Sequence, residues 1–482
     1  MRDLTRNPAP PRASVRALTA VVLLVVGAGG CSLGPRYVKP QPVVEPSFVE
    51  VNADTFTAAR PPASALWHSF GDPVLDSLID AALARNKTLA QSIAQVNEAR
   101  ALRGLEAFAL LPTVTASGSR STSRPSDRDP FVPPGIGKTT TFKAGFDASW
   151  EMDLFGGARS ARRAVRADQS AAEAGLEAAR QAVVAEVAQA YFSLRAEQER
   201  LRVVTRNVAD LDENQRLFTA RFEAGRGTDL DVSRARSLWL QTSARIPQTE
   251  LSISRDEQRL AVLTVQSVES LRGMLGEARP LPAMPTLVAV GTPADWIRRR
   301  PDVREAEQRL IGATARVGID AADYLPNLTL LGGFGWTGQL AKDIGASDAR
   351  RWNYGPSLQW SFLDVGRVRQ RVLAGKARMA GALAAYDATV LLALEETENA
   401  LAGYRAGNRA AVALADATEA ARTATRVARA RFDAGAIDSL AFLDAERSQL
   451  DLEDQLATAE SQRATALAAL YKALVGDFAA AP

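Results

Sequence analysis

The apolar residues of this chain change their spacing twice in the same order, at positions about 210 residues apart. Each time, a helix-like spacing of three and four ends at a Leu-Pro pair: it runs first from Pro73 to Leu111-Pro112 and then from Pro301 to Leu325-Pro326. Proline suits the first position of a helix, so each of these segments is predicted to be one helix. A spacing of two follows, and a long helix-like spacing then resumes at Gly156 or at Gly366. Because a period of 3.6 is typical of helices and a period of 2 of strands, the sequence predicts a tandem repeat of helix, two strands and long helix.

The regions with a period of two, about 113–153 and 327–363, predict two strands each, with one apolar and one polar face. The apolar positions are Phe142, Ala144, Phe146, Ala148, Trp150 and Met152 in the first region, and Trp352, Tyr354, Leu358, Trp360 and Phe362 in the second. A half-buried strand of a soluble sheet alternates in the same way. The aromatic residues on the apolar face favour a strand of an outer-membrane barrel, which has lipid on one side and water on the other.

Four strands in one chain are too few to close a barrel, and an open sheet edge is not tolerated in lipid. Several chains must therefore combine. Two chains would give eight strands and a barrel filled by its own side chains, whereas three would give twelve strands and room for a lumen. A conduit favours three chains.

Two long helices with returning partners follow the strand regions. Residues 157 to about 223 contain no proline and carry apolar residues in a heptad pattern, which predicts one continuous coiled-coil helix. Glu197 is a polar residue at one of the apolar heptad positions. A partner helix is predicted from 230 to 265, and the second copy repeats this with helices at 366–432 and 440–474. Gly225 and Gly435 mark the turns, where glycine suits a left-handed helix cap.

The N-terminus has the pattern of an export signal. Arg2, Arg6, Arg12 and Arg16 precede an apolar run at 17–26, and small residues lead to Cys31. This arrangement predicts a lipoprotein signal peptide at 1–30 and an acylated Cys31; the alternative is a plain signal peptide with a chance cysteine. The run is too short to span a bilayer, and no later segment approaches the roughly 20 apolar residues of a spanning helix. A membrane crossing would thus require a closed barrel.

Composition excludes several functions. The chain has 58 basic and 55 acidic residues, dispersed and nearly balanced, so no nucleic-acid partner is predicted. With one cysteine and one histidine, no metal cluster, catalytic dyad or triad can be assembled from the usual residues. We therefore expect no catalytic site, no metal and no cofactor, and regard an enzyme as a remote alternative.

One motif is specific enough to indicate a family. The residues Arg299-Arg300-Pro301-Asp302-Val303-Arg304-Glu305-Ala306-Glu307, the stretch from Trp67 to Asn86, the two Leu-Pro breaks and two Arg-Phe-X-Ala-Gly turns resemble the TolC-like outer-membrane factors. Within that family the resemblance is to the lipoprotein branch of RND-type multidrug efflux systems. It implies an α+β membrane protein: a trimer with a 12-stranded β-barrel in the outer membrane that continues into a long periplasmic α-helical coiled-coil barrel.

The resemblance also implies partners and site residues. A homotrimer in outer-membrane lipid would dock on a periplasmic adaptor bound to an inner-membrane RND pump. The adaptor would meet the helical turns at Arg221, Phe222, Gly225, Arg431, Phe432 and Gly435. Carboxylates past the turns would form a periplasmic gate, at Asp231 and Asp444 with Asp229 and Asp438 nearby. These aspartates could instead be helix N-caps, which Asp229 and Asp438 fit best. A gate arginine of some members is Ile437 here, so a different residue such as Arg226 would have to pair.

The expected layout is a signal peptide at 1–30, an arm of the equatorial region at 31–71, a first repeat at 72–275, a linker at 276–292, a second repeat at 293–475 and a tail at 476–482. The function implied is a passive exit duct for small toxic compounds. One alternative is the outer-membrane channel of an ABC-driven type I secretion system, which commonly lacks both the lipid signal and the Arg-Pro-Asp-Val-Arg stretch. A bracing coiled-coil lipoprotein would leave the four amphipathic strands unexplained.

Overall fold

The computed structural model describes residues 33–41, 45–51, 55–57, 70–126, 128, 130, 131, 133, 137–279, 281, 282 and 288–474. Cys31 and the predicted signal peptide therefore lie outside the described residues. The chain divides into two compact units. The first comprises Met1–Pro40, Asn97–Ala171 and Ala306–Ala385, and the second comprises Gln41–Val96, Ala172–Glu305 and Tyr386–Pro482.

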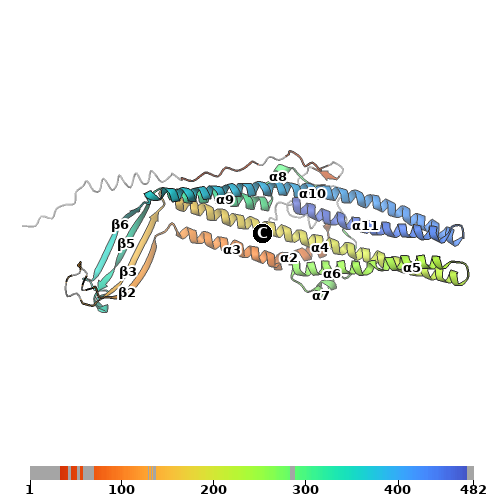
Figure 1. Cartoon of the computed structure of the whole chain (residues 1–482), viewed down its shortest axis with the longest axis horizontal. Coiled ribbons are helices and arrows are strands. Elements are labelled where there is room, and N and C mark those ends of the chain that lie inside the picture. The colour runs from red at the N-terminus through yellow and green to blue at the C-terminus, as the bar shows by residue number, and fades with distance from the viewer. Residues whose placement is uncertain are drawn as a thin grey trace, which may run out of the picture. The chain divides into compact units, whose positions relative to one another are not determined.

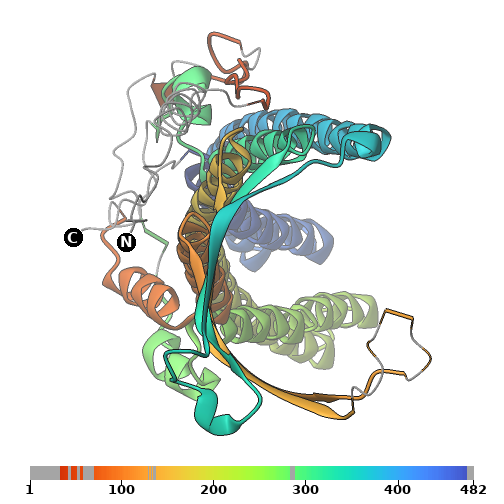
Figure 2. The same cartoon turned by 90° about the vertical axis from the view of Figure 1, so that its left-hand side faces the viewer.

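The first unit contains an antiparallel sheet of four strands in the order β2-β3-β5-β6. These strands are β2 (Thr113–Ser123), β3 (Thr139–Met152), β5 (Asn327–Gly338) and β6 (Arg350–Gln359). The two predicted strand regions thus pair with each other, through β3 and β5, into one sheet (Figure 1). The sheet is strongly curved (Figure 2). The second predicted strand region, 327–363, ends earlier than expected, at Gln359, because Phe362–Asp364 forms a turn of 3-10 helix.

The register of the sheet aligns the apolar residues of neighbouring strands. Phe146 lies opposite Ala116 on one side and Phe334 on the other, and Phe334 lies opposite Trp352. Because residues directly opposite each other share a face, these four side chains form one apolar row across the sheet. Trp352 is 69% exposed in the single chain. The predicted apolar face is therefore present, and it is open.

The helices that flank the sheet follow the predicted pattern with one correction. A single helix was expected from Pro73 to Leu111, but the structure has α2 (Pro73–Arg85) and α3 (Lys87–Phe108). The side chain of Asn86 breaks it, accepting hydrogen bonds from the backbone N–H of Thr88 at 2.9 Å and of Leu89 at 3.2 Å. In the second copy α9 (Pro301–Ala322) begins at the predicted proline.

The long helices are α4 (Gly157–Glu223) and α10 (Val365–Asp433), which closely match the spans predicted from the sequence. The heptad positions of α4 are largely buried, including Val187 and Leu194 at 0% exposure. Glu197, which interrupts the pattern, is half-buried; burial raises its pKa although Arg200 lies 3.5 Å away.

The returning helices differ between the copies. The second copy has one helix, α11 (Ser439–Leu474), as predicted. In the first copy the expected helix from 230 to 265 is two helices, α5 (Asp229–Ser243) and α6 (Arg245–Thr264), which meet at Ala244. Val265 ends α6 with a left-handed φ of 54°, a conformation that is uncommon for a β-branched residue.

Shorter elements complete the second unit. The strands β1 (Phe56–Thr57) and β4 (Val288–Ala289) pair in parallel, and α7 (Val268–Leu275) and α8 (Pro293–Ile297) lie on either side of β4 in the sequence. Arg300, from the motif that indicated the family, is buried. It donates to both oxygens of Asp302 and, at 2.6 Å, to Glu396. The motif thus holds part of the helical unit together.

Within the described part of the chain, one helical segment is long and apolar enough to cross a membrane by length and composition. It is Phe362–Asp433, whose best 18-residue window has a mean hydropathy of 1.3 and is only 17% buried. The apolar pattern of the sequence predicted no such segment. The core helix of a soluble protein meets the same criterion, so this single segment is weak support for a spanning helix.

Candidate functional site

The two helical turns at the ends of α4 and α10 have the same backbone geometry. Gly225 and Gly435 have left-handed φ angles of 67° and 69°. The N–H of Arg226 donates to the carbonyl of Arg221 at 2.8 Å, and the N–H of Ala436 donates to that of Arg431 at 2.8 Å. This pattern satisfies the last carbonyl groups of a helix and favours glycine at the turn, because the left-handed conformation is strained for most other residues. The two copies thus form matched hairpin tips.

Asp231 connects the two hairpins. It lies in the first turn of α5, where its Oδ2 accepts from the N–H and Oγ1 of Thr228 at 3.0 and 2.7 Å. Its other oxygen accepts a hydrogen bond from the hydroxyl of Ser439, the first residue of α11. Burial alone would raise the pKa of Asp231, but the hydrogen bonds from Ser439 and Thr228 lower it below its usual value. Asp231 is therefore a structural tie between the hairpins as well as a gate candidate.

The other gate candidates have different surroundings. Asp438 is an N-cap, as the alternative reading expected, and its Oδ1 accepts from the N–H of Ala441 at 3.0 Å. Asp229 was expected to cap α5, but Thr228 does so, because its hydroxyl accepts from the N–H of Asp231 at 3.3 Å. Asp229 and Asp444 are exposed. Asp438 is exposed as well, whereas Asp231 is half-buried.

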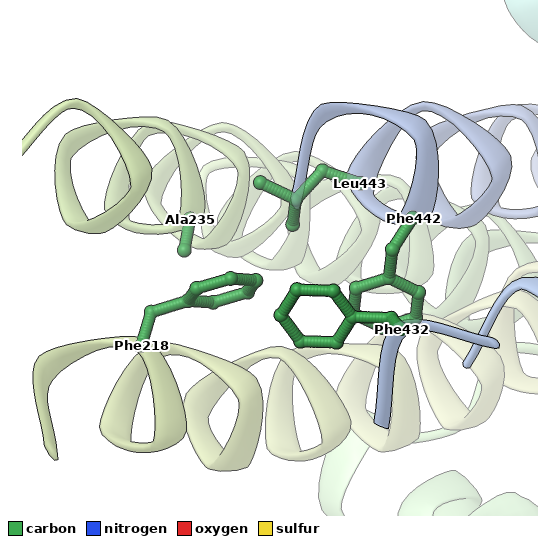
Figure 3. Packing of buried hydrophobic residues seen from close by; sticks show 5 residues of the cluster. All are labelled: Phe218, Ala235, Phe432, Phe442 and Leu443. Carbon is green, nitrogen blue, oxygen red and sulfur yellow. The ribbon is translucent and has the colours of Figure 1, made fainter. Parts of the chain in front are cut away.

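Below the tips the two hairpins share a hydrophobic core. It consists of Phe218, Ala235, Phe432, Phe442 and Leu443, from α4, α5, α10 and α11 (Figure 3). The rings of Phe432 and Phe442 stack with their centroids 5.4 Å apart and an interplanar angle of 12°. Ile437 packs against this core. The tip is therefore held by apolar contacts at Ile437, near which the family resemblance implied an ion pair.

The predicted adaptor-contact residues are not equivalent in the two copies. Phe432 is 6% exposed and lies under the guanidinium of Arg221, whose Cζ is 4.2 Å from the ring centroid. The matching residues Phe222 and Arg431 are both exposed, and Phe222 is 45% exposed. The repeated Arg-Phe sequence thus places one aromatic ring inside the hairpin pair and the other outside it.

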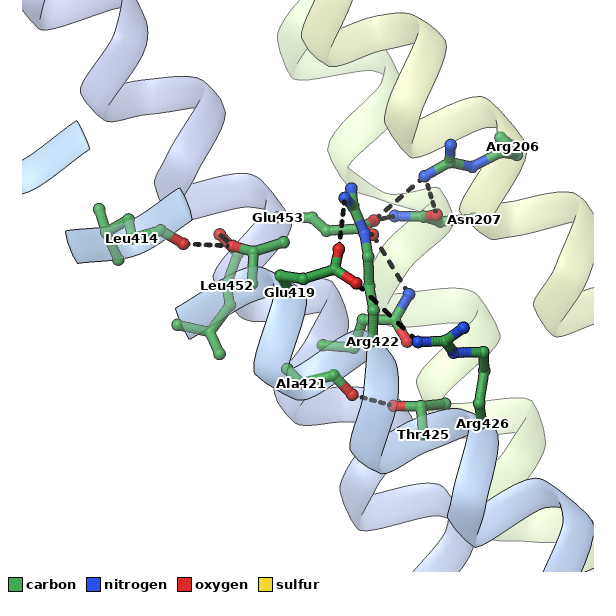
Figure 4. Close-up of polar contacts among 12 residues, drawn as sticks. Arg206, Asn207, Leu414, Glu419, Ala421, Arg422, Thr425, Arg426, Leu452 and Glu453 are labelled. Atoms are coloured by element: carbon green, nitrogen blue, oxygen red, sulfur yellow. Dashed lines mark hydrogen bonds and ion pairs between the residues drawn. The ribbon is translucent and has the colours of Figure 1, made fainter. Parts of the chain in front are cut away.

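Farther along the helices, a buried carboxylate joins the hairpins. Glu453 of α11 is 4% exposed and accepts from Asn207 of α4 at 3.0 Å and from Arg422 of α10 at 2.9 Å (Figure 4). Arg206 adds a contact at 3.3 Å. Burial would raise the pKa of Glu453, but these hydrogen bonds lower it, so the group stays charged.

One heptad nearer the tip, a similar set of residues is incompletely paired. Asn214 of α4 donates to Glu446 of α11, which is 9% exposed. Arg429 of α10 bonds the oxygen of Asn214 rather than the carboxylate, and Oε2 of Glu446 has no hydrogen-bond partner among the described residues. Burial raises the pKa of Glu446 to about 7, more than Arg429 lowers it. The two glutamates therefore differ in charge near neutral pH.

These buried polar residues were not predicted from the sequence. The available signal was their heptad spacing: Asn207 and Asn214 on α4 match Glu453 and Glu446 on α11. Among the residues that the structure describes, no group of three His, Cys, Asp or Glu side chains could hold a metal ion.

Comparisons with known proteins agree with this geometry. The family model described as "Outer membrane efflux protein" matches residues 78–264 and 293–476, one segment in each half of the chain. The chain is 30% identical to outer membrane protein OprJ of Pseudomonas aeruginosa over 95% of each chain. It is 28% identical to the toluene efflux pump outer membrane protein TtgF of Pseudomonas putida, over 95% of this chain and 96% of that one. The solved outer-membrane channel OprN superposes with a TM-score of 0.88 at 36% identity, over 93% of this chain and 100% of that one.

Proposed function

Because this chain belongs to the outer membrane efflux protein family, we propose that three copies form the exit duct of a tripartite efflux pump. The duct passively conducts small toxic compounds or drugs from a periplasmic adaptor and an inner-membrane RND pump to the exterior. OprJ and the toluene efflux protein TtgF, whose names describe outer-membrane proteins and an efflux pump, are the relatives that support this role.

The observation that carries the proposal is the open sheet. Within the described residues, β2 and β6 each pair on one side only, and the apolar row that includes Phe146, Phe334 and Trp352 is uncovered. Unpaired strand edges cannot face lipid, because their N–H and C=O groups would lose hydrogen bonds to water. Joining β6 of one chain to β2 of the next removes every edge, and three chains supply twelve strands around a lumen.

The helical hairpins would provide the periplasmic part of the duct. We assign the tips at Gly225 and Gly435 to adaptor contact, with Arg221, Phe222, Arg431 and Phe432 beside them. Asp231 and Asp444, with Asp229 and Asp438 nearby, would line the narrowest passage, and the hydrogen bonds of Asp231 and Asp438 would also hold the turns. A threefold ring of carboxylates favours cations over anions.

We also propose that Cys31 is acylated and becomes the mature N-terminus, which would add a lipid anchor to the protein. A globomycin-sensitive mass shift that disappears in Cys31→Ser would support this assignment. An unmodified mature N-terminus at another residue would contradict it.

Crosslinking in intact envelopes, followed by purification of this protein and mass spectrometry, tests the proposed function. Recovery of a periplasmic adaptor together with an RND pump is the expected result, with increased drug susceptibility of the deletion strain. Recovery with an ABC transporter would assign the duct to type I secretion instead. Recovery of neither partner, with unchanged susceptibility, would contradict the pump assignment.

A further inference from the structure

The contact between Arg221 and Phe432 joins the two hairpins of one chain at their tips. Arg221 ends α4 and Phe432 ends α10, and the guanidinium carbon lies 4.2 Å from the ring centroid. A cation this close to the face of an aromatic ring is attracted by the ring's quadrupole. We define the intrachain seam as this contact together with the Asp231–Ser439 hydrogen bond and the shared core around Phe218.

The tandem repeat relates this contact to a second pair. The first hairpin, α4 and α5, corresponds to the second hairpin, α10 and α11, so Arg221 corresponds to Arg431 and Phe222 to Phe432. The contact that mirrors Arg221–Phe432 is therefore Arg431–Phe222. This contact does not form within the chain. Both side chains are exposed, and among the described residues neither has a ring contact or an ion pair.

A second copy of the chain is the partner that fits these two side chains. In the assembly proposed above, on which this inference rests, first and second hairpins alternate around the ring. Each second hairpin then meets the first hairpin of the neighbouring chain in the arrangement seen inside one chain. We propose that Arg431 stacks on Phe222 of the partner subunit, and that this reciprocal contact closes the ring of tips between chains.

The other contacts of the intrachain seam have no counterpart between chains. The positions that correspond to Phe218 and Asp231 are Ala428 and Ala441. Glu446, which accepts from Asn214 inside the chain, corresponds to Arg236. The interchain seam thus keeps the cation–aromatic pair while losing a phenyl ring from its core and the carboxylate bond. We infer that Arg431 and Phe222 supply a larger share of the attraction at that seam.

Photocrosslinking of the full-length protein in outer membranes tests the contact directly. One tagged copy carries Phe222→p-benzoylphenylalanine and is expressed with an untagged copy of the unmodified chain. The expected product has twice the mass of one chain, which shows that the link joins two chains. After digestion, it links position 222 to the peptide that contains Arg431. Arg221→p-benzoylphenylalanine is the matched control, and it should react within its own chain near Phe432. A probe at 222 that reacts elsewhere, or not at all while the control reacts, would overturn the proposal.

A double-variant cycle provides a second measurement. Arg431→Ala and Phe222→Leu should each accelerate trimer dissociation, by about threefold per contact and on the order of thirtyfold for three contacts. The double variant should dissociate no faster than the single variants, because each removes the same contact. Multiplicative effects would show that the two residues act separately and would reject the pair.

The outcomes separate this inference from the proposed function. Trimers that export drugs but lack the 222–431 link would leave the duct in place and reject only the contact. Chains that remain monomeric in the membrane, in a strain whose drug susceptibility does not depend on them, would reject both.

Discussion

The indole Nε1 of Trp150 donates a hydrogen bond to the backbone carbonyl of Leu110 at 3.0 Å, and Trp360 does the same to Tyr324 at 3.2 Å. In each copy the acceptor stands two residues before the proline of the Leu-Pro pair. Leu110 and Tyr324 lie just past the ends of α3 and α9, where the chain turns into a strand, so their carbonyls have no helical donor. The tryptophan at the far end of the strand pair replaces that donor.

We predict that Trp150→Phe and Trp360→Phe each lower the stability of the protein by about 0.5–1 kcal/mol, because each leaves one carbonyl without its donor. The thermal midpoint of the detergent-solubilised protein measures this. Trp352→Phe is the control, since Trp352 lies on the apolar row and is 69% exposed. An equal loss in all three variants would mean that ring size matters rather than the hydrogen bond.

The two buried glutamates of α11 should respond oppositely to the same substitution. Glu453→Gln weakens charge-assisted hydrogen bonds from Arg206 and Arg422 and should destabilise the protein by about 1–2 kcal/mol. Glu446→Gln removes a carboxylate with one unpartnered oxygen and should stabilise the protein at pH 8. Denaturant midpoints of the two variants decide this, and shifts of the same sign would contradict the assignment of charge states.

The pH dependence of stability should identify Glu446. Its pKa rises from 4.5 to about 7 in the folded chain, so between these values the folded state binds a proton that the unfolded state has lost. Stability therefore falls as pH rises through this window, by on the order of 3 kcal/mol in total, and is level above it. In Glu446→Gln the slope between about pH 5 and 7 should flatten. A slope unchanged by the substitution would assign the proton to another group.

The gate candidates should separate into two effects. Asp444→Ala removes an exposed carboxylate, so it should reduce cation preference with little loss of stability. Asp231→Ala also breaks the bonds to Thr228 and Ser439, so it should raise single-channel conductance and lower the thermal midpoint. The double variant should show the largest cation leak. Planar-bilayer recordings of reconstituted protein measure both quantities, and unchanged conductance and selectivity would remove these residues from the gate.

The tip glycines should be required for their conformation alone. Gly225 and Gly435 have positive φ, and a Cβ at either position would meet nothing within 4 Å. Alanine at either site should cost about 1 kcal/mol from backbone strain, with asparagine tolerated better. Equal midpoints for the alanine and asparagine variants would argue against strain as the cause.

The sequence predicted the elements whose signal is local and periodic. The span of α4 and the alternation of β3 follow from a spacing of apolar residues that is repeated many times, so no single residue decides the prediction. Interruptions were missed where one side chain decides them. Asn86 divides the helix expected from Pro73 to Leu111 by bonding the backbone N–H of Thr88, and Thr228 rather than Asp229 caps α5.

The site was less predictable than the fold, because its contacts join residues far apart in the chain. Asn207 and Glu453 are separated by 246 positions, and no local pattern shows that their helices meet. The same limit applies to Arg221 and Phe432. Both motifs read Arg-Phe, yet only the packing of the hairpins shows which ring is inside.

The repeat also has a consequence for symmetry. A ring of six identical hairpins would have six equivalent boundaries, so none could loosen without the same change at the others. Joining two hairpins in one polypeptide lets Phe218, Asp231 and Glu446 differ from Ala428, Ala441 and Arg236, the residues at the corresponding positions of the other half. Firm boundaries within a chain and weaker boundaries between chains can then alternate. In the proposed duct, the two hairpins of each chain would therefore move together as one rigid unit, and the three units would separate at the boundaries between chains.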